Sequence, residues 1–427
     1  MTGNQPEKYD VIVIGGGPSG LMASIAARTI GASTLLIEKG NRLGRKLGIS
    51  GGGRCNVTNA KQLPELMQNI PGNARFLHSV LSRYSNMDIM AFFEGLGIRL
   101  KEEDRGRVFP VSDKAATVVK ALVDKVYQLG VEVWIDTPVR RLMSQDNRIA
   151  GVMLYDQTTV AAKAIVVATG GCSVPKTGST GDAYPWAKAL GHTIVDPFPT
   201  EVPLTSDEWF IRERTLQGLS LQGIEISILD QRGKKLTTES GDMIFTHFGL
   251  SGPASLRCSH YVSTSLRKAP QSPLAASIDC LPAKKRGEII ESLERSRKTD
   301  GRKHLSTMIT QWLPERLAQV ILVREDIEGA TQMANVSNDT IMKVANNVKS
   351  FSVRLTGTLP LAQATVTGGG VSVKEMDPKT MASKLHQGLY FAGEVMDVHG
   401  HTGGYNITVA FSTGHCAGTS AALFTQQ

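Results

Sequence analysis

The hydrophobic positions at the start of the chain form two short continuous runs with a helical segment between them. Tyr9–Gly15 (YDVIVIG) and Thr34–Glu38 (TLLIE) are apolar without polar alternation, which is typical of strands buried on both faces of a sheet. Residues Pro18–Ile30 favour a helix. The pattern therefore predicts a βαβ unit, the building block of a parallel sheet.

Further segments extend this α/β pattern to about residue 195. Residues 62–130 look mostly helical, with VVKALVDKVYQLG the clearest periodic stretch, and VEVWIDTPVRRL and IAGVMLY are expected strands. Ala164–Gly171 (AIVVATGG) is another buried strand that ends in glycines.

The pattern of hydrophobic and polar positions changes after residue 195. Short alternating strands such as GIEISILD fill residues 196–280 and are typical of a small antiparallel β-barrel, residues 284–348 are polar and helical, and SFSVRLT is one more strand. From ATVTGGGVS the glycine-rich α/β texture returns and continues to the end. We therefore predict an α/β fold in which a Rossmann-like nucleotide-binding domain, residues 1–195 and 363–427, is interrupted by an inserted substrate or cap domain, residues 196–362.

The turn after the first strand carries a nucleotide-binding fingerprint, Gly15-x-Gly17-x-x-Gly20. The three glycines permit a tight turn, let the backbone approach a pyrophosphate and let the helix pack on the strand. The N-terminus of that helix offers N–H groups and partial positive charge to phosphates. Glu38 ends the second strand, where a carboxylate accepts both ribose hydroxyls of an adenosine. These features predict a bound dinucleotide, either FAD or NAD.

The C-terminal stretch GLYFAGEVMDVHGHTGGYNITVAFSTGHCAG distinguishes the two cofactors. A strand at Leu389–Ala392 ends at Gly393-Glu394, and a glycine-rich turn, His401–Gly404, opens a helix near Tyr405. Flavoproteins of the glutathione-reductase class use such an acid for the ribityl chain and aim such a helix at the flavin N1/C2=O edge. We therefore expect FAD. A second GxGxxG with a partner acid is missing from the sequence, so NAD(P)H is expected only as a transient reductant.

Seven motifs together resemble one family: GRKLGISGGGRCNVTN, GRVFPVSDKA, SVPKTGSTGDAY, TEVPL, FTHFGLSGPA, VTGGGVSVKEMDPKTMASK and GLYFAGEVMDVHGHTGGYNIT. The chain is identified as a member of the BaiN/RdsA-type NAD(P)/FAD-dependent oxidoreductases and is most similar to the YtfP-type flavoproteins of Firmicutes. The resemblance covers essentially the whole chain. It implies a flavoenzyme, but the family includes members assigned to bile-acid enone reduction, to dihydrouridine formation in 23S ribosomal RNA and to aminoacetone oxidation.

The resemblance also implies where the cofactor lies. The Gly51–Gly53 run would wrap the flavin side of FAD, with Arg45 and Lys46 near the pyrophosphate, while Arg54 would either offset phosphate or substrate charge or form an internal salt bridge. The expected FAD contacts are Gly15, Gly17, Pro18, Ser19, Gly20, Glu38, Lys39, Arg45, Lys46, Ser50, Gly51, Gly52, Gly53, Val139, Thr169, Gly170, Gly393, Glu394, Gly403, Gly404, Asn406 and Ile407.

Three residues are candidates for proton transfer. Reduction of a conjugated C=C bond needs a hydride from flavin N5 at the β carbon and a proton at the α carbon from a placed acid. Cys55 beside the glycine run is one candidate, and the alternative for it is a small buried hydrophobic residue. His401, in the turn before the last helix, and His247 are the others, each with a structural role as its alternative.

Composition and charge narrow the partners. The 427 residues include 47 Lys and Arg against 39 Asp and Glu, a net charge of +8 that permits an anionic partner. Residues 284–304 are rich in Lys and Arg, which predicts either an RNA-facing patch or a solvated helix face. Five cysteines without C-x-x-C indicate no zinc site and no disulfide framework. Without an 18-residue apolar run or a signal peptide, a cytoplasmic protein without a membrane or metal partner is expected.

The favoured function is therefore an FAD-dependent reductase of a conjugated C=C bond, with uridine in 23S ribosomal RNA as the best substrate. The alternatives are a flavin oxidase or enone reductase of a small molecule, and a flavin redox sensor without turnover.

Overall fold

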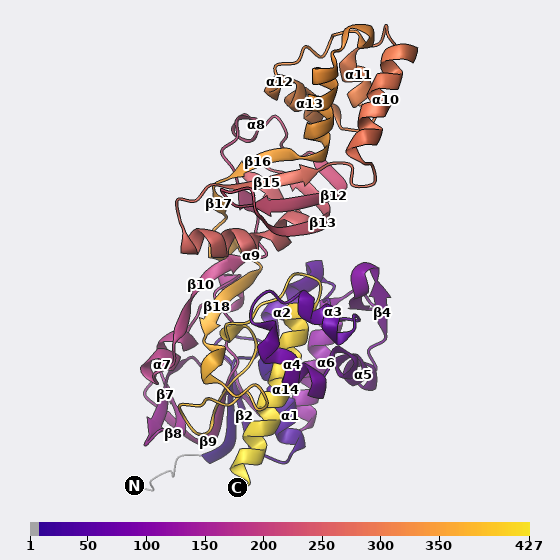
Figure 1. Ribbon diagram of the computed structural model, residues 1–427. Helices are drawn as coiled ribbons and strands as arrows, with labels where there is room; N and C mark the ends of the chain where they lie inside the picture. Colours follow the sequence, from indigo (N-terminus) through magenta and orange to yellow (C-terminus); the bar gives the residue numbers. More distant parts are fainter. Residues whose placement is uncertain (1–7) are drawn as a thin grey trace, which may run out of the picture. The chain divides into compact units, whose positions relative to one another are not determined.

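The computed structural model describes residues 8–427, which form two compact units (Figure 1). One unit contains the described residues up to 198 together with residues 361–427, and the other contains residues 199–360. The expected insert was 196–362. Each unit has its own hydrophobic core.

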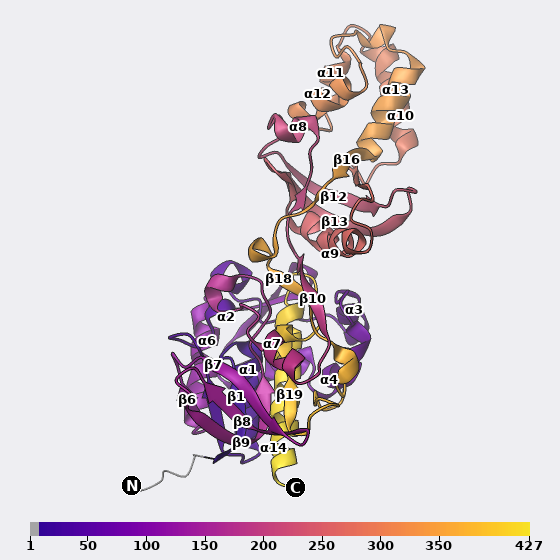
Figure 2. The same ribbon diagram turned by 90° about the vertical axis from the view of Figure 1, so that its left-hand side faces the viewer.

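A seven-stranded sheet forms the centre of the first unit. Its strand order is β6-β2-β1-β9-β8-β7, and β19 pairs with β9 (Figure 2). The strands β6, β2, β1, β9 and β19 run parallel, whereas β8 and β7 are antiparallel additions. Their bounds are β1 (Lys8–Ile14), β2 (Thr34–Ile37), β6 (Glu132–Trp134), β7 (Val139–Gln145), β8 (Arg148–Leu154), β9 (Thr159–Val167) and β19 (Leu389–Phe391). The continuous apolar runs of β1 and β2 are explained because both faces are buried.

Two helices pack closely beside this sheet. They are α1 (Pro18–Thr29) and α14 (Tyr405–Thr425), which run side by side in Figure 1. A Cβ built on Gly414 would lie 2.3 Å from Ser19 O, and one on Gly418 would lie 2.1 Å from Ala23 O. The glycines of α14 therefore allow the two helix backbones to touch.

The segment between β2 and β6 is mostly helical, as predicted, but it also contains a small sheet that the sequence did not predict. The helices are α2 (Arg45–Ile49), α3 (Leu63–Gln68), α4 (Ala74–Arg83), α5 (Asn86–Gly95) and α6 (Ala115–Gln128). The sheet has the order β3-β5-β4, with β3 (Thr58–Asn59), β4 (Leu100–Glu103) and β5 (Arg107–Pro110). Its strands are only two to four residues long, so they carry almost no periodicity. The unit is completed by α7 (Ala183–Ala189) and by β10 (Ile194–Thr200) paired with β18 (Val366–Val371).

The second unit is built on an antiparallel sheet of seven strands in the order β16-β15-β12-β13-β14-β11-β17. The strands are β11 (Leu204–Thr205), β12 (Ser220–Leu229), β13 (Lys235–Phe245), β14 (Gly249–Ser251), β15 (Leu274–Asp279), β16 (Phe351–Leu355) and β17 (Gly357–Thr358). They form one path with β16 and β17 at its ends, so closure into a barrel stays a prediction.

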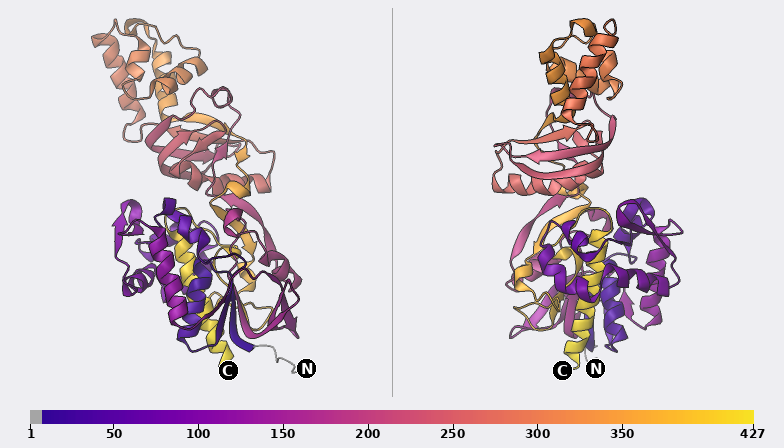
Figure 3. Two further views of the ribbon diagram at one scale, coloured as in Figure 1. Left: turned by 180° about the vertical axis from the view of Figure 1, so that it is seen from behind. Right: turned by 45° about the vertical axis from the view of Figure 1, so that its right-hand side comes forward.

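The strands of the second sheet alternate buried and exposed residues, so one face of the sheet belongs to the core. The long helix α9 (Pro253–Lys268) packs on β12 and β13, and a separate group of four helices (orange in Figure 3) meets the sheet where α13 packs against β15 and β16. The group comprises α10 (Arg286–Thr299), α11 (Leu305–Ile309), α12 (Glu315–Arg324) and α13 (Asn338–Lys349), and the short helix α8 (Trp209–Arg212) lies between β11 and β12 in the chain. Over residues 8–427, the structure contains no helix of the length and hydropathy that a membrane crossing needs.

Candidate functional site

The expected cofactor residues follow the carboxyl ends of four neighbouring strands. Gly15 follows β1, Glu38 follows β2, Thr169 lies two residues beyond β9, and Gly393 lies two residues beyond β19. Because these strands are parallel, the four positions meet at one edge of the sheet. Ligands of open α/β sheets bind in the crevice outside this edge.

The first turn has the geometry of a phosphate-binding turn. Gly15 has φ +107°, and a Cβ on Gly20 would lie 1.8 Å from Gly15 O, so any side chain at Gly20 would push α1 away from β1. The N-cap residue Gly17 contributes no capping side chain, and a Cβ built on it would meet no atom within 4 Å. The first N–H groups of α1, beginning with Ser19, therefore face open space at the positive end of the helix.

Glu38 is held in place by the turn that it faces. Its Oε2 accepts a hydrogen bond from Gly16 N at 2.7 Å, and its Oε1 accepts one from Gly40 N at 2.7 Å. A carboxylate oxygen has two lone pairs, so each oxygen keeps one for a further donor. The side chain is therefore oriented and still able to accept from the two hydroxyls of a ribose.

Glu394 lies in a network of four chain segments. Its Oε2 contacts Lys46 Nζ at 2.6 Å, and its Oε1 accepts from Ser173 Oγ at 3.0 Å and from Thr367 N at 2.8 Å. Lys46 Nζ also donates to Ser173 Oγ at 2.7 Å. Oε1 is thus saturated, and only Oε2 can accept one more bond. Burial raises the pKa of Glu394, but Lys46 and the two hydrogen bonds outweigh it, so the pKa lies below its usual value.

The other two cations near this crevice bind protein groups. Lys39 Nζ lies 2.5 Å from both Asp182 Oδ2 and Thr180 Oγ1, and Arg45 Nη2 donates to Lys176 O at 2.8 Å. Both contacts fix the loop that follows β9. Ser173 and Thr367, which meet Glu394, were not expected from the sequence, since only the folded chain brings them there.

The glycine run forms a tight left-handed turn. Gly51, Gly52 and Gly53 have φ values of +57°, +68° and +86°, and Ser50 Oγ donates to Leu47 O at 2.7 Å. A Cβ on Gly52 or Gly53 would meet no protein atom within 4 Å. The positive φ values, rather than crowding by the protein, therefore explain glycine at these two positions.

The N-terminus of α14 packs directly on the strand after the glycine run. Gly404 has φ +97° and caps the helix without a side chain, and a Cβ built on it would lie 2.5 Å from Thr58 O. Asn59 Nδ2 donates to Gly403 O at 2.9 Å. The side-chain amide of Asn406 accepts from Gly400 N and donates to Gly400 O, at 2.8 Å each, and so stabilises the turn before α14. The backbone N–H groups of Asn406 and Ile407 belong to the first turn of α14, which has no side-chain cap.

Cys55 is fully buried in the hydrophobic core of the first unit. Its backbone has φ +62°, and its N–H donates to Ser50 O at 3.0 Å. Burial raises the pKa of its thiol to about 12, although a hydrogen bond with Ser50 lowers it. The thiol is therefore a weaker acid than a free cysteine, and the packing alternative fits its surroundings.

The two candidate histidines lie in different units. His401 is buried in the first unit. Its backbone N–H donates to Asn69 O at 2.8 Å, and its backbone carbonyl accepts from Asn406 Nδ2 at 3.2 Å. His247 is exposed in the second unit, in the turn between β13 and β14.

Of its two expected roles, Arg54 takes that of an internal salt bridge. Its guanidinium forms ion pairs with Glu103 and with Asp113, the latter at 2.6 Å, and lies over the ring of Phe109 at 4.2 Å. These contacts tie the glycine run to β4 and β5, so Arg54 is occupied by the protein itself.

The residues present fit FAD. Asn56 Oδ1, Thr169 Oγ1 and Tyr184 Oη are among the buried polar side-chain atoms of the first unit that have no hydrogen-bond partner. Two uncapped helix N-termini supply donors for phosphate and carbonyl oxygens, and two oriented carboxylates supply acceptors for hydroxyls. Within the part of the chain that the structure describes, no group of His, Cys, Asp and Glu could hold a metal ion.

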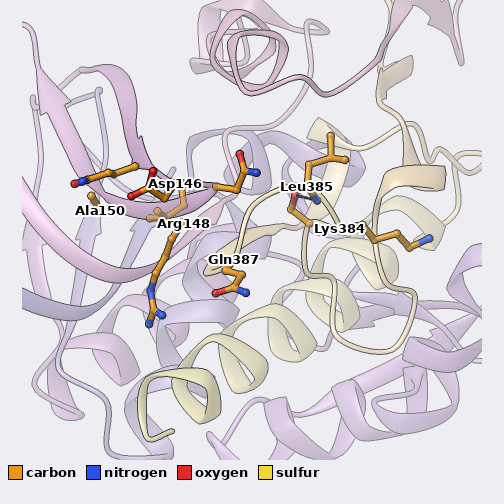
Figure 4. A pocket seen from close by; sticks show the side chains of 10 residues that line it. Asp146, Arg148, Ala150, Lys384, Leu385 and Gln387 are labelled. Carbon is orange, nitrogen blue, oxygen red and sulfur yellow. Dashed lines mark hydrogen bonds between the residues drawn. The ribbon is translucent and has the colours of Figure 1, made fainter.

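A separate hollow of about 540 Å³ lies between the β7–β8 turn and the loop 383–387 (Figure 4). Its polar groups largely bond within the protein: Ile149 N donates to Gln387 O at 2.9 Å, and Lys384 Nζ donates to Lys374 O at 2.9 Å. Arg148, which also lines the hollow, lies over the ring of Phe424 at 5.3 Å. The expected cofactor and proton-transfer residues do not line it.

Comparison with known proteins identifies relatives over nearly the full length. The family model described as HI0933-like protein Rossmann domain matches residues 9–420. The ribosomal RNA dihydrouridine synthase of Haemophilus influenzae is 30% identical over 411 residues, which cover 96% of this chain and 97% of that protein. The 3-dehydro-bile acid delta(4,6)-reductase of Clostridium scindens is 26% identical over 417 residues, which cover 96% of this chain and 98% of that protein.

Among solved structures, the 3-ketosteroid delta1-dehydrogenase of Sterolibacterium denitrificans superimposes with a TM-score of 0.52 at 14% identity, covering 98% of this chain and 100% of that chain. At this identity the likeness concerns the fold alone.

Proposed function

Because the chain belongs to the HI0933-like Rossmann family and is an FAD-dependent oxidoreductase, we propose that it reduces a conjugated C=C bond, with uridine in 23S ribosomal RNA as substrate. The family predicted from the motifs is thereby confirmed, and membership of this family supports FAD as the cofactor. The observation that carries the proposal is the near full-length similarity to a ribosomal RNA dihydrouridine synthase.

The two named relatives support the reaction class more strongly than the substrate. One name describes the formation of dihydrouridine and the other a delta(4,6)-reductase, so both describe the addition of two hydrogens to a C=C bond. Uridine C5=C6 and a steroid enone are both conjugated to a carbonyl. A shared reaction on two unlike substrates is expected when the cofactor site is retained and the substrate site varies.

We assign the cofactor contacts from the crevice at the sheet edge. The N-terminus of α1 would bind the pyrophosphate, Glu38 the adenosine ribose, and Glu394 Oε2 a hydroxyl of the ribityl chain. Gly51–Gly53 and the N-terminus of α14 would enclose the flavin. FAD, when bound there, supplies the hydride at its N5 atom.

Of the three proton-transfer candidates, Cys55 has the least support, whereas His401, which is also buried, and the exposed His247 stay proposed. A general acid must come within hydrogen-bond reach of the carbon that it protonates. The thiol of Cys55 has no exposed surface and a pKa of about 12, so it is poorly suited to reach and protonate a substrate.

An RNA contact through residues 284–304 is also part of the proposal, although the cations there are not equivalent. Arg297 Nη1 donates to Val336 O at 3.1 Å and to Asn338 Oδ1 at 2.8 Å, so it stabilises the helical group. Lys285, Arg295 and Lys298 are exposed and remain candidates for phosphate contact. Along α10, Glu291 and Glu294 precede Arg295 and Lys298 by four residues, so the middle of the helix has mixed charge.

The direct test is mass spectrometry of 23S ribosomal RNA from a strain that lacks the gene. Loss of one uridine that is 2 Da heavier than normal, and its return when the gene is restored, supports the proposal. Unchanged RNA in the deletion strain would reject it.

A small-molecule enone reductase is the second candidate, favoured by the similarity to the bile-acid reductase. Replacing Lys285, Arg295 and Lys298 by Gln distinguishes the two candidates. With a polyanionic substrate, KM rises and its salt dependence flattens, whereas with a small neutral enone neither changes.

A further inference from the structure

The side chain of Asn56 has an unsatisfied acceptor in the interior of the first unit. The residue is 7% exposed, and its Oδ1 has no hydrogen-bond partner. A buried amide oxygen without a partner costs about 1–3 kcal/mol, so such atoms in folded proteins usually meet a ligand or an ordered water.

Asn56 lies where the two flavin-side elements meet. A Cβ built on Gly51 would lie 3.0 Å from Asn56 N, and a Cβ built on Gly404 would lie 3.0 Å from Asn56 Oδ1. Gly51 belongs to the left-handed glycine turn, and Gly404 is the N-cap of the 21-residue helix α14. The Asn56 amide therefore lies between the glycine turn and the uncapped N-terminus of α14.

The helix N-terminus and the amide present opposite hydrogen-bonding groups side by side. The first turn of α14 has N–H groups without a side-chain cap and carries partial positive charge, which suits a carbonyl oxygen. Asn56 Oδ1 beside it is an acceptor and requires an N–H donor. A ligand that satisfies both must carry a carbonyl next to an N–H.

The pyrimidine edge of the flavin ring has this arrangement, since N3–H stands between C2=O and C4=O. Resting on the FAD site proposed above, we infer that Asn56 accepts a hydrogen bond from flavin N3–H while the N-terminus of α14 faces the adjoining carbonyl, so that Asn56 favours a flavin that carries a proton at N3. The neighbouring side chains do not compete for this role. The Asn406 amide bonds Gly400, and Thr58 Oγ1 lies 2.7 Å from Thr408 Oγ1.

The test uses the full-length chain freed of flavin and two probes, FAD and 3-methyl-FAD, in which a methyl group replaces the N3 proton. The wild type is expected to bind FAD roughly 10-fold or more tightly than 3-methyl-FAD, the order of one buried hydrogen bond and its unpaired partner. In Asn56→Ala this preference falls below about 3-fold, because the acceptor and the steric block are both gone. Asn56→Asp, which keeps an acceptor at the same place, retains the preference.

The matched control is Thr169→Val, which removes another buried polar atom without a hydrogen-bond partner, the Thr169 hydroxyl, from the same unit. This variant is expected to weaken both flavins equally and to leave the preference unchanged. Each variant serves as its own reference, because the measured quantity is a ratio of two affinities. A wild type that binds the two flavins equally, or an Asn56→Ala variant with the wild-type preference, would overturn the inference.

Should Asn56→Ala fail to fold, the wild-type holoenzyme reconstituted with [15N3]-FAD tests the same contact by NMR. A resolved N3–H signal in slow exchange with water is expected. A proton that exchanges as fast as that of free FAD would reject the hydrogen bond.

Discussion

At the scale of single residues, the proposed FAD site contains two carboxylates that are oriented by different means. Glu38 is held by two backbone N–H groups, and Glu394 is held mainly by Lys46. The position of Glu38 could be predicted from the sequence because it follows a strand at a fixed distance from the fingerprint. The partners of Glu394 could not be predicted, since Ser173 and Thr367 reach it only through tertiary contacts.

Replacing Glu38 by alanine is expected to weaken FAD binding by roughly 30- to 150-fold, because a charge-assisted bidentate acceptor is lost. Titration of the flavin-free chain with FAD, followed by fluorescence, measures the change. Glu94→Ala on the exposed face of α5 is the control and should bind FAD normally. If Glu38→Ala has wild-type affinity, Glu38 does not bind the ribose.

Replacing Lys46 by methionine is expected to reverse the pH dependence that Glu394 contributes to stability. In the wild type, the pKa of Glu394 is lower in the folded state than in the unfolded chain. The contribution of Glu394 to stability is therefore complete above its pKa in the unfolded chain and is lost as the pH falls through its pKa in the folded state. Without Lys46, burial dominates and the pKa rises, so the free energy of unfolding of the variant increases as the pH falls from 8 to 5.

Urea midpoints of both proteins between pH 8 and pH 5 measure this difference. Lys46→Arg keeps a cation and should behave as the wild type. Parallel profiles for the wild type and Lys46→Met would show that Lys46 does not control Glu394.

Replacing Cys55 by alanine is expected to lower the free energy of unfolding by about 1 kcal/mol, as for loss of one small buried group. Reduction of the bound flavin and turnover per flavin should stay near wild type, because the thiol packs in the core. Stopped-flow measurement of each half-reaction checks this. A 10²- to 10⁴-fold loss confined to substrate reduction would instead identify Cys55 as the general acid.

At the scale of elements, long apolar segments bounded by glycine were predictable and short paired ones were not. The strands β1, β2 and β19 and the helices α1 and α14 lie where their patterns predicted them, whereas β9 begins five residues before the predicted strand Ala164–Gly171 and ends four residues before its end. The sheet β3-β5-β4 was missed because its strands are two to four residues long and β4, LKEE, is mostly charged. The pairing of β3 with β5 joins Thr58 to Val108, 50 residues apart, which periodicity cannot reveal.

The contact between α1 and α14 gives a prediction at this scale. In Gly418→Ala, the new methyl group would lie 2.1 Å from Ala23 O, so the helices must separate and the free energy of unfolding should fall by roughly 1–3 kcal/mol. Gly95→Ala at the end of α5 is the matched control, because its methyl group would meet no atom within 4 Å. Thermal or urea unfolding compares the two. Equal stability would mean that the helix contact tolerates a side chain at Gly418.

At the scale of the whole molecule, one chain supplies a cofactor unit and a second unit with its own core. The sequence predicted this organisation from the interruption and return of the glycine-rich texture, because such texture accompanies a nucleotide site whatever lies between its two parts. The substrate could not be predicted in the same way. Substrate contacts are made by individual surface side chains, whose arrangement leaves no periodic trace in a sequence.

The measurement that tests the central claim most directly is anaerobic oxidation of the reduced enzyme by its substrate. The bound flavin is reduced completely, mixed with a 23S ribosomal RNA transcript that lacks modifications, and followed by its absorbance, and the RNA is then analysed by mass spectrometry. The account predicts that the flavin is reoxidised and that one uridine gains 2 Da for each flavin oxidised. A flavin that stays reduced in the presence of the transcript, with the RNA mass unchanged, would contradict it.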